Sequence, residues 1–336
     1  MKVKDIGELR LIKDVIFPEL DRIHSNRNVI IDRGDDAACV RLKKLAILTT
    51  DTFIEKVHFD PTYFTFSEIG YRTLVAALSD IAAMGGSPKF ALVSIQIPPN
   101  LNANSVKELY SGMIRISKKF KLKIIGGDTV SSKTLGITVT IIGEGDRIVK
   151  RSGARLNDSI FVTGELGSSS FGLYLLNKSK FSSKDSYLIK RHKMPIPRIV
   201  EGKILAKSIN SMIDLSDGLS TDLHHIIEES KVGAVIYKEK IPLHRSLKKI
   251  ARRGNRDPYD FALYGGEDYE LLFTAPRKKG SMISKKVRAK TGIKVTEIGI
   301  IFKKEEGVWL EADGKRIPLN PLGYDHFQHK LSTFQA

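Results

Sequence analysis

Strand-like and helix-like segments alternate along almost the whole chain. Residues 45–48 and 90–97 are rich in β-branched and apolar side chains, whereas 73–84 between them (TLVAALSDIAAM) form a nearly unbroken apolar helix that stops at Gly85 and Gly86. Alternation of this kind is typical of helices packed on a sheet. The fold class predicted from it is therefore α/β, in the broad sense of a mixed α+β chain.

Helix starts in the first half carry a recognisable signature. Thr65 and Glu68 have the spacing of a capping box ahead of the apolar helix. Ser105 and Glu108 repeat that spacing and predict the start of a second helix, which continues to about residue 120. Strands are predicted at 123–125 and 135–142, with Gly126, Gly127 and Asp128 in a loop between them.

A turn-rich stretch at 145–155 divides the chain. Its 336 residues are enough for two domains that each bury a core. We place the boundary so that the domains are 1–147 and 148–336. In the second half we expect strands at 159–163 and 212–215, helices near Phe171 and Arg198, and a helix from about Asp217.

Composition excludes several classes of protein. Apolar content of 41% and charged content of 28% are those of a globular chain, and no apolar run approaches the ~20 residues of a membrane helix. The first 17 residues have charges at helical spacing and predict an amphipathic helix instead of a leader. The one cysteine, Cys39, cannot form an internal disulfide, which favours the cytoplasm; within AACV we expect it to be a small buried residue.

The chain is strongly basic, with 55 Lys and Arg against 38 Asp and Glu, a net charge of +17. Nucleic-acid binding, anionic substrates and simple solubility would each account for such a charge. The basic residues lie in short scattered groups, without a long basic arm, zinc-finger spacing or an aromatic RNA-binding signature. We predict a solvated face and do not favour nucleic acid as a partner.

In so basic a chain, the acids at the edges of apolar segments need an explanation. They occur in GDD, TTD, LSD, GGD and DLSD, and the candidates are Asp35, Asp36, Asp51, Asp80, Asp128, Asp214 and Asp217. Asp80 is the sharpest case, because an ionised carboxylate among small apolar neighbours is costly to desolvate unless it meets a cation. Any one of these acids could be a cap or turn residue. As a set they favour a hard cation, magnesium or calcium, over zinc.

Glycine-flanked acids of this kind suggest nucleotide phosphates held through metal ions. Asp214 and Asp217 straddle a predicted strand-to-helix turn, where Ser216 can cap the helix and free amides can meet phosphate. The sequence has neither a P-loop nor the protein-kinase motifs. If the chain handles ATP, metal ions must therefore do what loop amides and a lysine do elsewhere.

The motifs GDDAACV, TTDTFIEKVHF, ALSDIAAMGGSP, IIGGDTV, MIDLSDGLSTDL, YGGEDYELLFT and GYDHF, in this order from about residue 30 to 327, closely resemble the thiamine-monophosphate kinases. That family belongs to a superfamily with aminoimidazole ribonucleotide synthetase, selenophosphate synthetase and a hydrogenase-maturation protein. The resemblance implies a two-domain aminoimidazole ribonucleotide synthetase-like fold. Its N-terminal ATP- and magnesium-binding domain contributes strands to a β-barrel across a homodimer, and its C-terminal domain completes the active site.

The resemblance also implies site residues and an activity. The activity is ATP- and Mg²⁺-dependent phosphorylation of thiamine monophosphate to thiamine diphosphate by in-line transfer. The implied metal ligands are Asp36, Thr50, Asp51, Asp80, Asp128, Asp214 and Asp217. The implied nucleotide contacts are Thr49, Tyr110, Gly127, Asp128, Arg151 and Ser216, and the implied acceptor contacts are His58, Glu267 and Tyr324. Lys56 departs from the family, which often has glycine there, and this bears on the role of His58.

Elementary chemistry explains why no general base is among these residues. A phosphate monoester has a second pKa near ~6, so its attacking oxygen is already ionised at neutral pH. The remaining obstacle is repulsion between two polyanions, which metal ions on carboxylates offset. The alternatives are another ATP-using synthetase of the superfamily, a basic nucleic-acid-binding protein with structural aspartates, or a metal-stabilised structural dimer.

Overall fold

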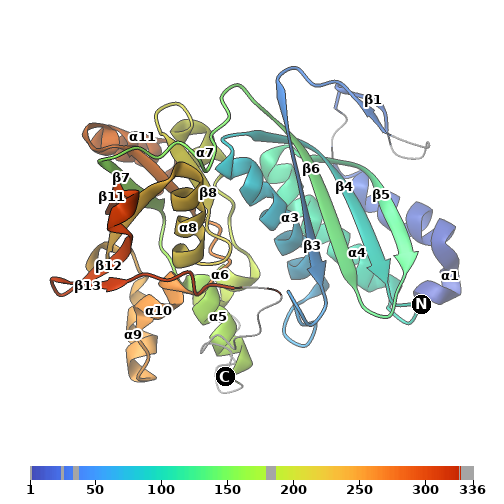
Figure 1. Ribbon diagram of the computed structural model, residues 1–336. Coiled ribbons are helices and arrows are strands. Elements are labelled where there is room, and N and C mark those ends of the chain that lie inside the picture. Colours follow the sequence, from blue (N-terminus) through green and yellow to red (C-terminus); the bar gives the residue numbers. More distant parts are fainter. Residues whose placement is uncertain (1, 24–25, 33–37, 179–186, 325, 327–336) are drawn as a thin grey trace. The chain divides into compact units, whose positions relative to one another are not determined.

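The computed structural model describes residues 2–23, 26–32, 38–178, 187–324 and 326 (Figure 1). The chain divides into two compact units. The N-terminal unit comprises residues 1–81 and 86–146, and the C-terminal unit comprises residues 82–85 and 147–336. Each unit is built around a sheet of its own.

The N-terminal unit contains a four-stranded sheet in the order β3-β6-β4-β5. These strands are β3 (Leu45–Ile54), β4 (Ser87–Ile97), β5 (Lys123–Ser131) and β6 (Gly136–Gly145). Two 18-residue helices, α3 (Phe66–Ala83) and α4 (Ala103–Phe120), lie against one face of the sheet (Figure 1). The other elements are α1 (Val3–Arg10), a π-helical turn (Leu11–Ile16), α2 (Phe17–Leu20) and the small pair β1 (Val29–Ile31) and β2 (Cys39–Val40).

The two predicted helix starts have different outcomes. At α3 the capping box is confirmed: the amide of Thr65 donates to Glu68 Oε2 at 2.9 Å and the amide of Glu68 donates to Thr65 Oγ1 at 3.2 Å. At α4 the prediction of Ser105 as the cap is wrong. The helix begins earlier because Asn102 Oδ1 accepts the amide of Asn104 at 2.9 Å, which satisfies an otherwise free N–H group.

Helices α3 and α4 cross at two glycines. A Cβ on Gly70 would lie 1.9 Å from the carbonyl oxygen of Leu109, and one on Gly112 would lie 1.9 Å from that of Ser67. Backbones therefore approach at a distance that no side chain permits. This close contact fixes α3 relative to α4 on one face of the sheet, and it thereby fixes the segment of α3 that carries Asp80.

The sheet has one buried face and one open face. Along β3, Ile47 and Phe53 are buried, whereas Leu48 between them is 68% exposed. Successive side chains of a strand point to opposite faces, so Thr49 and Asp51 share the helix-covered side with Ile47. The prediction of a loop at Gly126–Asp128 is wrong. Strand β5 continues through these residues because they pair with 92–94 of the parallel neighbour β4.

The C-terminal unit contains a seven-stranded sheet in the order β13-β12-β9-β11-β7-β10-β8. The strands are β7 (Asp158–Thr163), β8 (Ser211–Asp214), β9 (Val232–Tyr237), β10 (Leu271–Pro276), β11 (Val295–Lys303), β12 (Val308–Ala312) and β13 (Lys315–Pro318). The helices are α5 (Ser168–Asn177), α6 (Tyr187–Lys193), α7 (Ile199–Leu205), α8 (Leu219–Ser230), α9 (Arg245–Arg253), α10 (Pro258–Leu263) and α11 (Gly280–Thr291), with short 3₁₀ turns at 238–240, 277–279 and 304–306.

One hydrophobic core holds the strands and helices of this unit together. Buried apolar residues of β7, β8, β9 and α8 form one continuous cluster, to which Ile160, Ile213, Ile236 and Leu223 belong. The strands predicted at 159–163 and 212–215 lie in it within a residue of their predicted bounds. Cys39, predicted to be buried, is exposed on the short strand β2. In the described part of the chain no helix is long and apolar enough to cross a membrane.

Candidate functional site

The N-terminal unit brings three predicted residues together. Thr49 and Asp51 lie on the helix-covered face of β3, and Asp80 lies on α3. The hydroxyl of Thr49 donates a hydrogen bond to Asp80 Oδ2. Asp51 is close enough to Asp80 for their charges to repel. Two carboxylates from distant segments thus share one small, mostly buried volume.

Asp51 is the most informative of these side chains. Burial, aided by repulsion from Asp80, raises the pKa of its carboxyl to about 7. Within the described residues its Oδ2 is buried and accepts no hydrogen bond. A buried carboxylate oxygen without a partner costs free energy unless a cation meets it. The pair therefore fits a hard divalent cation, whose charge would offset both carboxylates.

Thr50 and Asp128 lie on the opposite, open face of the same sheet. Thr50 pairs with Thr140 of β6, and their hydroxyls are 3.1 Å apart. Asp128 is exposed on β5 beside Ser94 of β4. β3 and β5 are the two edges of the four-stranded sheet, three strand spacings or roughly 14 Å apart (Figure 1). One copy of the unit therefore does not bring Asp128 to Asp51 and Asp80.

Two predicted nucleotide contacts of this unit, Gly127 and Tyr110, lie in closely packed positions. A Cβ on Gly127 would lie 1.7 Å from the carbonyl oxygen of Val93, so only glycine fits at this point of the pairing between β5 and β4. Tyr110 lies on α4 with 3% of its surface exposed, and burial raises the pKa of its phenol. Asp36 lies outside the described residues, as does Asp35.

The turn after β3 positions His58. Its Nδ1 accepts the amide of Ile54 at 3.1 Å, and its ring lies 5.0 Å from that of Phe53. Lys56 in this turn has a φ of 67°, the left-handed region that glycine adopts most easily. The departure from the family at Lys56 thus falls at the position that requires this conformation, and the turn still forms around His58.

The C-terminal unit gathers a second group at the end of β8. The strand ends at Asp214, and α8 begins at Leu219, so Asp214 and Asp217 do straddle a strand-to-helix turn. Ser216 does not cap the helix. The cap position is Gly218, and the side chain of Asp222 accepts the amides of Asp217 and Gly218, both at 3.1 Å.

Asp222 and His225 were missed by sequence reasoning. With Asp217 they offer ligand atoms that all lie within 4.8 Å of one another, a grouping that could hold a metal ion. Their spacing of three residues in DLSDGLSTDLHH puts them on one face of α8, which was the available signal. Burial raises the pKa of Asp217, and positive charge on His225, His326 and Arg151 acts against that rise.

Backbone bonds bring Glu267 and Tyr324 to the same turn. The amide of Glu267 donates to the carbonyl of Ser216 at 2.8 Å, and the amide of Tyr324 donates to that of Asp217 at 3.1 Å. The hydroxyl of Tyr324 lies 3.3 Å from His326 Nδ1, and the two rings meet edge to face at 4.8 Å. Glu267, the ring of Tyr324 and the carboxylates of Asp217 and Asp222 thus surround one turn.

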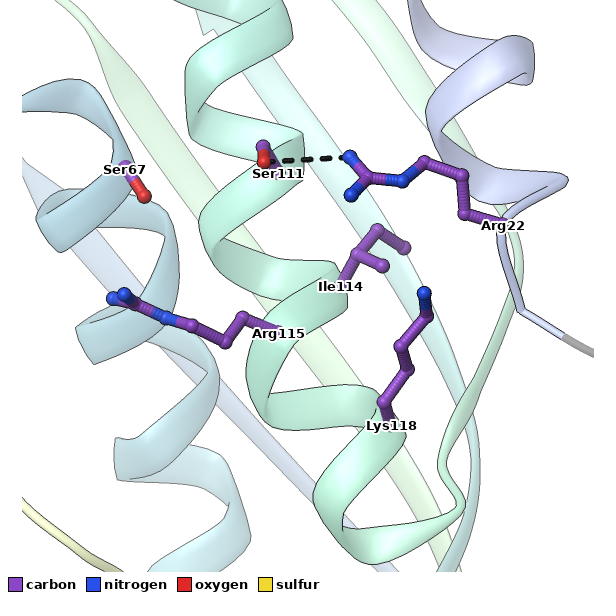
Figure 2. A pocket seen from close by; sticks show the side chains of 6 residues that line it. All are labelled: Arg22, Ser67, Ser111, Ile114, Arg115 and Lys118. Atoms are coloured by element: carbon purple, nitrogen blue, oxygen red, sulfur yellow. Dashed lines mark hydrogen bonds between the residues drawn. The ribbon is translucent and has the colours of Figure 1, made fainter.

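A separate basic cavity lies among the helices of the N-terminal unit (Figure 2). Its volume is about 280 Å³, and its lining residues are Arg22, Ser67, Ser111, Ile114, Arg115 and Lys118. Arg22 points toward Ser111, whose hydroxyl lies 3.5 Å from the guanidinium (Figure 2). None of the predicted site residues lines this cavity.

Comparison with known proteins first defines the class. The N-terminal domain of AIR synthase related protein matches residues 34–145, and the C-terminal domain of the same class matches residues 155–310. The hydrogenase maturation protein HypE in complex with ATP has the same fold, with a TM-score of 0.77 at 20% identity over 94% of this chain and 95% of its own. Two AIR synthase related domains, each with clustered carboxylates, therefore make up the chain.

Closer relatives identify the family. Thiamine-monophosphate kinase of Aquifex aeolicus is 38% identical over 97% of this chain and 100% of its own, and that of Bacillus subtilis is 38% identical over 92% and 99%. AaThiL complexed with AMPPCP and TMP superposes with a TM-score of 0.75 at 37% identity, covering 97% of this chain and 99% of that one. The chain belongs to the thiamine-monophosphate kinase family.

Proposed function

We propose that this chain transfers the γ-phosphoryl group of ATP to thiamine monophosphate, forming thiamine diphosphate in a Mg²⁺-dependent reaction. The observation that carries the proposal is the agreement with thiamine-monophosphate kinases over nearly the whole of both chains. A related structure holds AMPPCP and TMP together, which are a non-transferring ATP analogue and the acceptor. The enzyme is thus a phosphotransferase whose acceptor is a phosphate group.

The carboxylates of both units are the proposed magnesium ligands. Asp51 on the helix-covered face of β3 with Asp80 of α3, and Asp214 with Asp217 at the end of β8, supply the hard oxygen donors that Mg²⁺ prefers. Asp36, Thr50 and Asp128 complete the proposed set, and Asp222 with His225 adjoins it. Bound Mg²⁺ would neutralise phosphate charge during in-line transfer.

The chain's other residues bind and orient the two substrates. Thr49, Gly127, Ser216 and Arg151 are the proposed nucleotide contacts, with Arg151 as a charged partner for phosphate. On the acceptor side, the negative charge of Glu267 and the ring of Tyr324 suit the permanent cation of thiamine's thiazolium, where a cation–π contact contributes about 0.5–2 kcal/mol. His58 is proposed to donate to the acceptor phosphate. No residue is required to remove a proton, since that phosphate is already ionised.

We propose that the working unit is a homodimer. In the described part of the chain β3 and β5 end the sheet as unpaired edges, and the open face carries Leu48, Leu92 and Val130, which are 68%, 37% and 43% exposed. A second sheet across this face would close a barrel and cover these side chains. It would also give Asp128 a neighbour, because an edge-to-edge pairing of β5 with the partner's β3 brings Asp128 alongside the strand that carries Thr50 and Asp51 in the other copy.

The direct test is to incubate the purified protein with thiamine monophosphate, ATP and Mg²⁺ and to follow thiamine diphosphate by chromatography. Magnesium-dependent product is expected, and Asp128→Ala should lower kcat by about 10²-fold or more, the scale on which lost electrostatic stabilisation acts. A folded protein that binds ATP but forms no thiamine diphosphate would overturn the acceptor. Salt-sensitive retention of nucleic acid without magnesium-dependent turnover would favour the nucleic-acid alternative.

The proposed compartment is the cytoplasm. The chain has one cysteine, which lies exposed on β2, and so it has no internal disulfide to protect. A reducing compartment suits such a thiol.

A further inference from the structure

The loop that carries Glu267 contains one accessible acid and two buried ones. Asp268 and Glu270 are 3% and 0% exposed, whereas the side chain of Glu267 is 27% exposed. Glu267 and Tyr269, on either side of Asp268, have φ angles of 67° and 50°. Two non-glycine residues in the left-handed region cost free energy, so the surrounding structure must hold this loop in place.

Asp268 supplies one of the anchors. Its Oδ2 accepts the amide of Gly167 at 2.5 Å and its Oδ1 accepts the amide of Ser169 at 3.0 Å. These amides belong to the start of α5, where Gly167 offers no side chain for capping. Asp268 therefore caps a helix about one hundred residues away along the chain, and this fixes the backbone next to Glu267.

His192 reaches Glu267 from the other side. Its Nδ1 lies 3.6 Å from Glu267 Oε2 and 3.2 Å from Ser169 Oγ. The imidazole is 1% exposed, so it has little freedom to turn. Ser169 thus binds Asp268 through its amide and contacts His192 through its hydroxyl. The first turn of α5 therefore acts on Glu267 through two neighbours: Asp268 next to it in the chain and His192 beside its carboxylate.

Helix α6, which carries His192, is fastened by a buried ion network. Arg191 donates to Glu270 Oε1 at 3.0 Å and to the carbonyl of Asp268 at 3.4 Å. Arg198 binds both oxygens of Glu270, with Nε to Oε2 at 2.6 Å. Thr163 of β7 donates to the same carboxylate at 2.7 Å. Breaking a buried charged pair is costly, so α6 keeps a fixed position relative to the loop.

We propose that His192 is a positioning residue for Glu267: together with Ser169, it sets the direction of the carboxylate that recognises the cationic ring of the acceptor. The inference rests on the proposed function, which assigns Glu267 to the acceptor. His192 does not touch the substrate. It acts by reducing the number of conformations open to Glu267 before the acceptor binds, which lowers the entropic cost of binding.

The test compares four variants with the wild-type chain: His192→Ala, His192→Asn, Ser169→Ala and Glu267→Gln. His192→Ala should raise KM for thiamine monophosphate about five- to tenfold, the scale of one lost polar contact. KM for ATP should stay close to wild type. His192→Asn keeps a polar group near the position of Nδ1 and should restore most of the loss. Ser169→Ala keeps the amide that Asp268 needs and should raise the same KM by a smaller factor.

A double-mutant cycle separates positioning from a structural role. If His192 acts through Glu267, adding His192→Ala to Glu267→Gln should change KM for the acceptor by less than about twofold. The inference would be overturned if the effects of the two substitutions on KM for the acceptor multiplied, or if His192→Ala raised KM for the acceptor and KM for ATP equally. An unchanged KM for the acceptor in His192→Ala would also overturn it. A wild-type chain that never phosphorylates thiamine monophosphate is a different result, since it overturns the proposed function and the acceptor role of Glu267 with it.

Discussion

At the scale of the single residue, Asp268 is an acid whose burial outweighs the groups that favour its charge. Burial raises the pKa of its carboxyl to about 7, although two amides and Arg191 act in the opposite direction. The folded chain therefore holds a proton on Asp268 between about pH 4 and 7 where the unfolded chain has lost it. Stability from this group is fully present below the unfolded value of 3.8 and declines as pH rises toward 7.

Asp268→Asn should remove this pH dependence. Between pH 5 and 7 the wild-type free energy of unfolding should fall by about 2–3 kcal/mol relative to that of the variant, at about 1.4 kcal/mol per pH unit. Urea denaturation at the two pH values measures the difference. Asp313→Asn, on the exposed turn between β12 and β13, controls for the loss of one carboxylate. A difference between wild type and Asp268→Asn that does not change with pH would contradict the prediction.

Single residues also mark where sequence reasoning stops. It listed Asp51 and Asp80 among several acids at the edges of apolar segments, and the structure brings these two side chains together. Asp222 and His225 escaped it, since a helix of mixed polarity gives little sign of which face meets the preceding turn. His192 and Asp268 could not be found either. Their importance lies in contacts across 23 to about 100 residues of chain, which local pattern does not encode.

At the scale of the element, the crossing of α3 and α4 reverses the usual effect of replacing glycine by alanine in a helix. Glycine to alanine in the middle of a helix usually stabilises it by up to about 1 kcal/mol. At Gly112 a Cβ would lie 1.9 Å from the carbonyl oxygen of Ser67. Gly112→Ala should therefore destabilise the N-terminal unit by about 1–3 kcal/mol, the range for overpacked cores. Thermal or urea denaturation measures it.

A matched variant on the same helix makes that result specific. Lys107 is exposed on α4, and Lys107→Ala should change the free energy of unfolding by less than about 0.5 kcal/mol. Stabilisation by Gly112→Ala, as helix propensity alone predicts, would contradict the prediction. It would mean that α3 and α4 can move apart to accommodate the added methyl group. Activity should fall with Gly112→Ala as well, because α3 carries Asp80.

Element boundaries show which sequence signals are decisive. Reciprocal capping by Thr65 and Glu68 was predictable because both partners lie within four residues. The same spacing at Ser105 misled, since Asn102 offers an equivalent oxygen one turn earlier. Glycines at 126 and 127 suggested a loop, yet β5 continues through them because a close approach to β4 requires residues without side chains. Such a close approach depends on the tertiary structure and cannot be predicted from the presence of glycine alone.

At the scale of the whole molecule, the position of Asp128 at the β5 edge, opposite β3, leads to a prediction about two copies. Asp51→Ala and Asp128→Ala should each be inactive alone. If each site takes Asp51 from one copy and Asp128 from the other, a mixed dimer of the two variants contains one site with both defects and one with neither. When the two variants are mixed at equal concentrations and exchange subunits without unfolding, about a quarter of wild-type activity should return. Half of the dimers are then mixed, and half of the sites in the mixed dimers are intact.

The alternative arrangement makes the opposite prediction with the same reagents. If Asp51 and Asp128 of one copy served one site, every site in a mixed dimer would carry one defect, and no activity would return. Mixing Asp51→Ala with Asp80→Ala is the matched control, because these two carboxylates lie together in one copy and should not complement. Activity restored by the first mixture but not by the second would mean that the open face of the sheet is an interface and that the reaction requires two chains. Giving the two variants different affinity tags and recovering both after capture through one tag shows whether mixed dimers formed, so that an absence of activity can be attributed to the arrangement of the carboxylates.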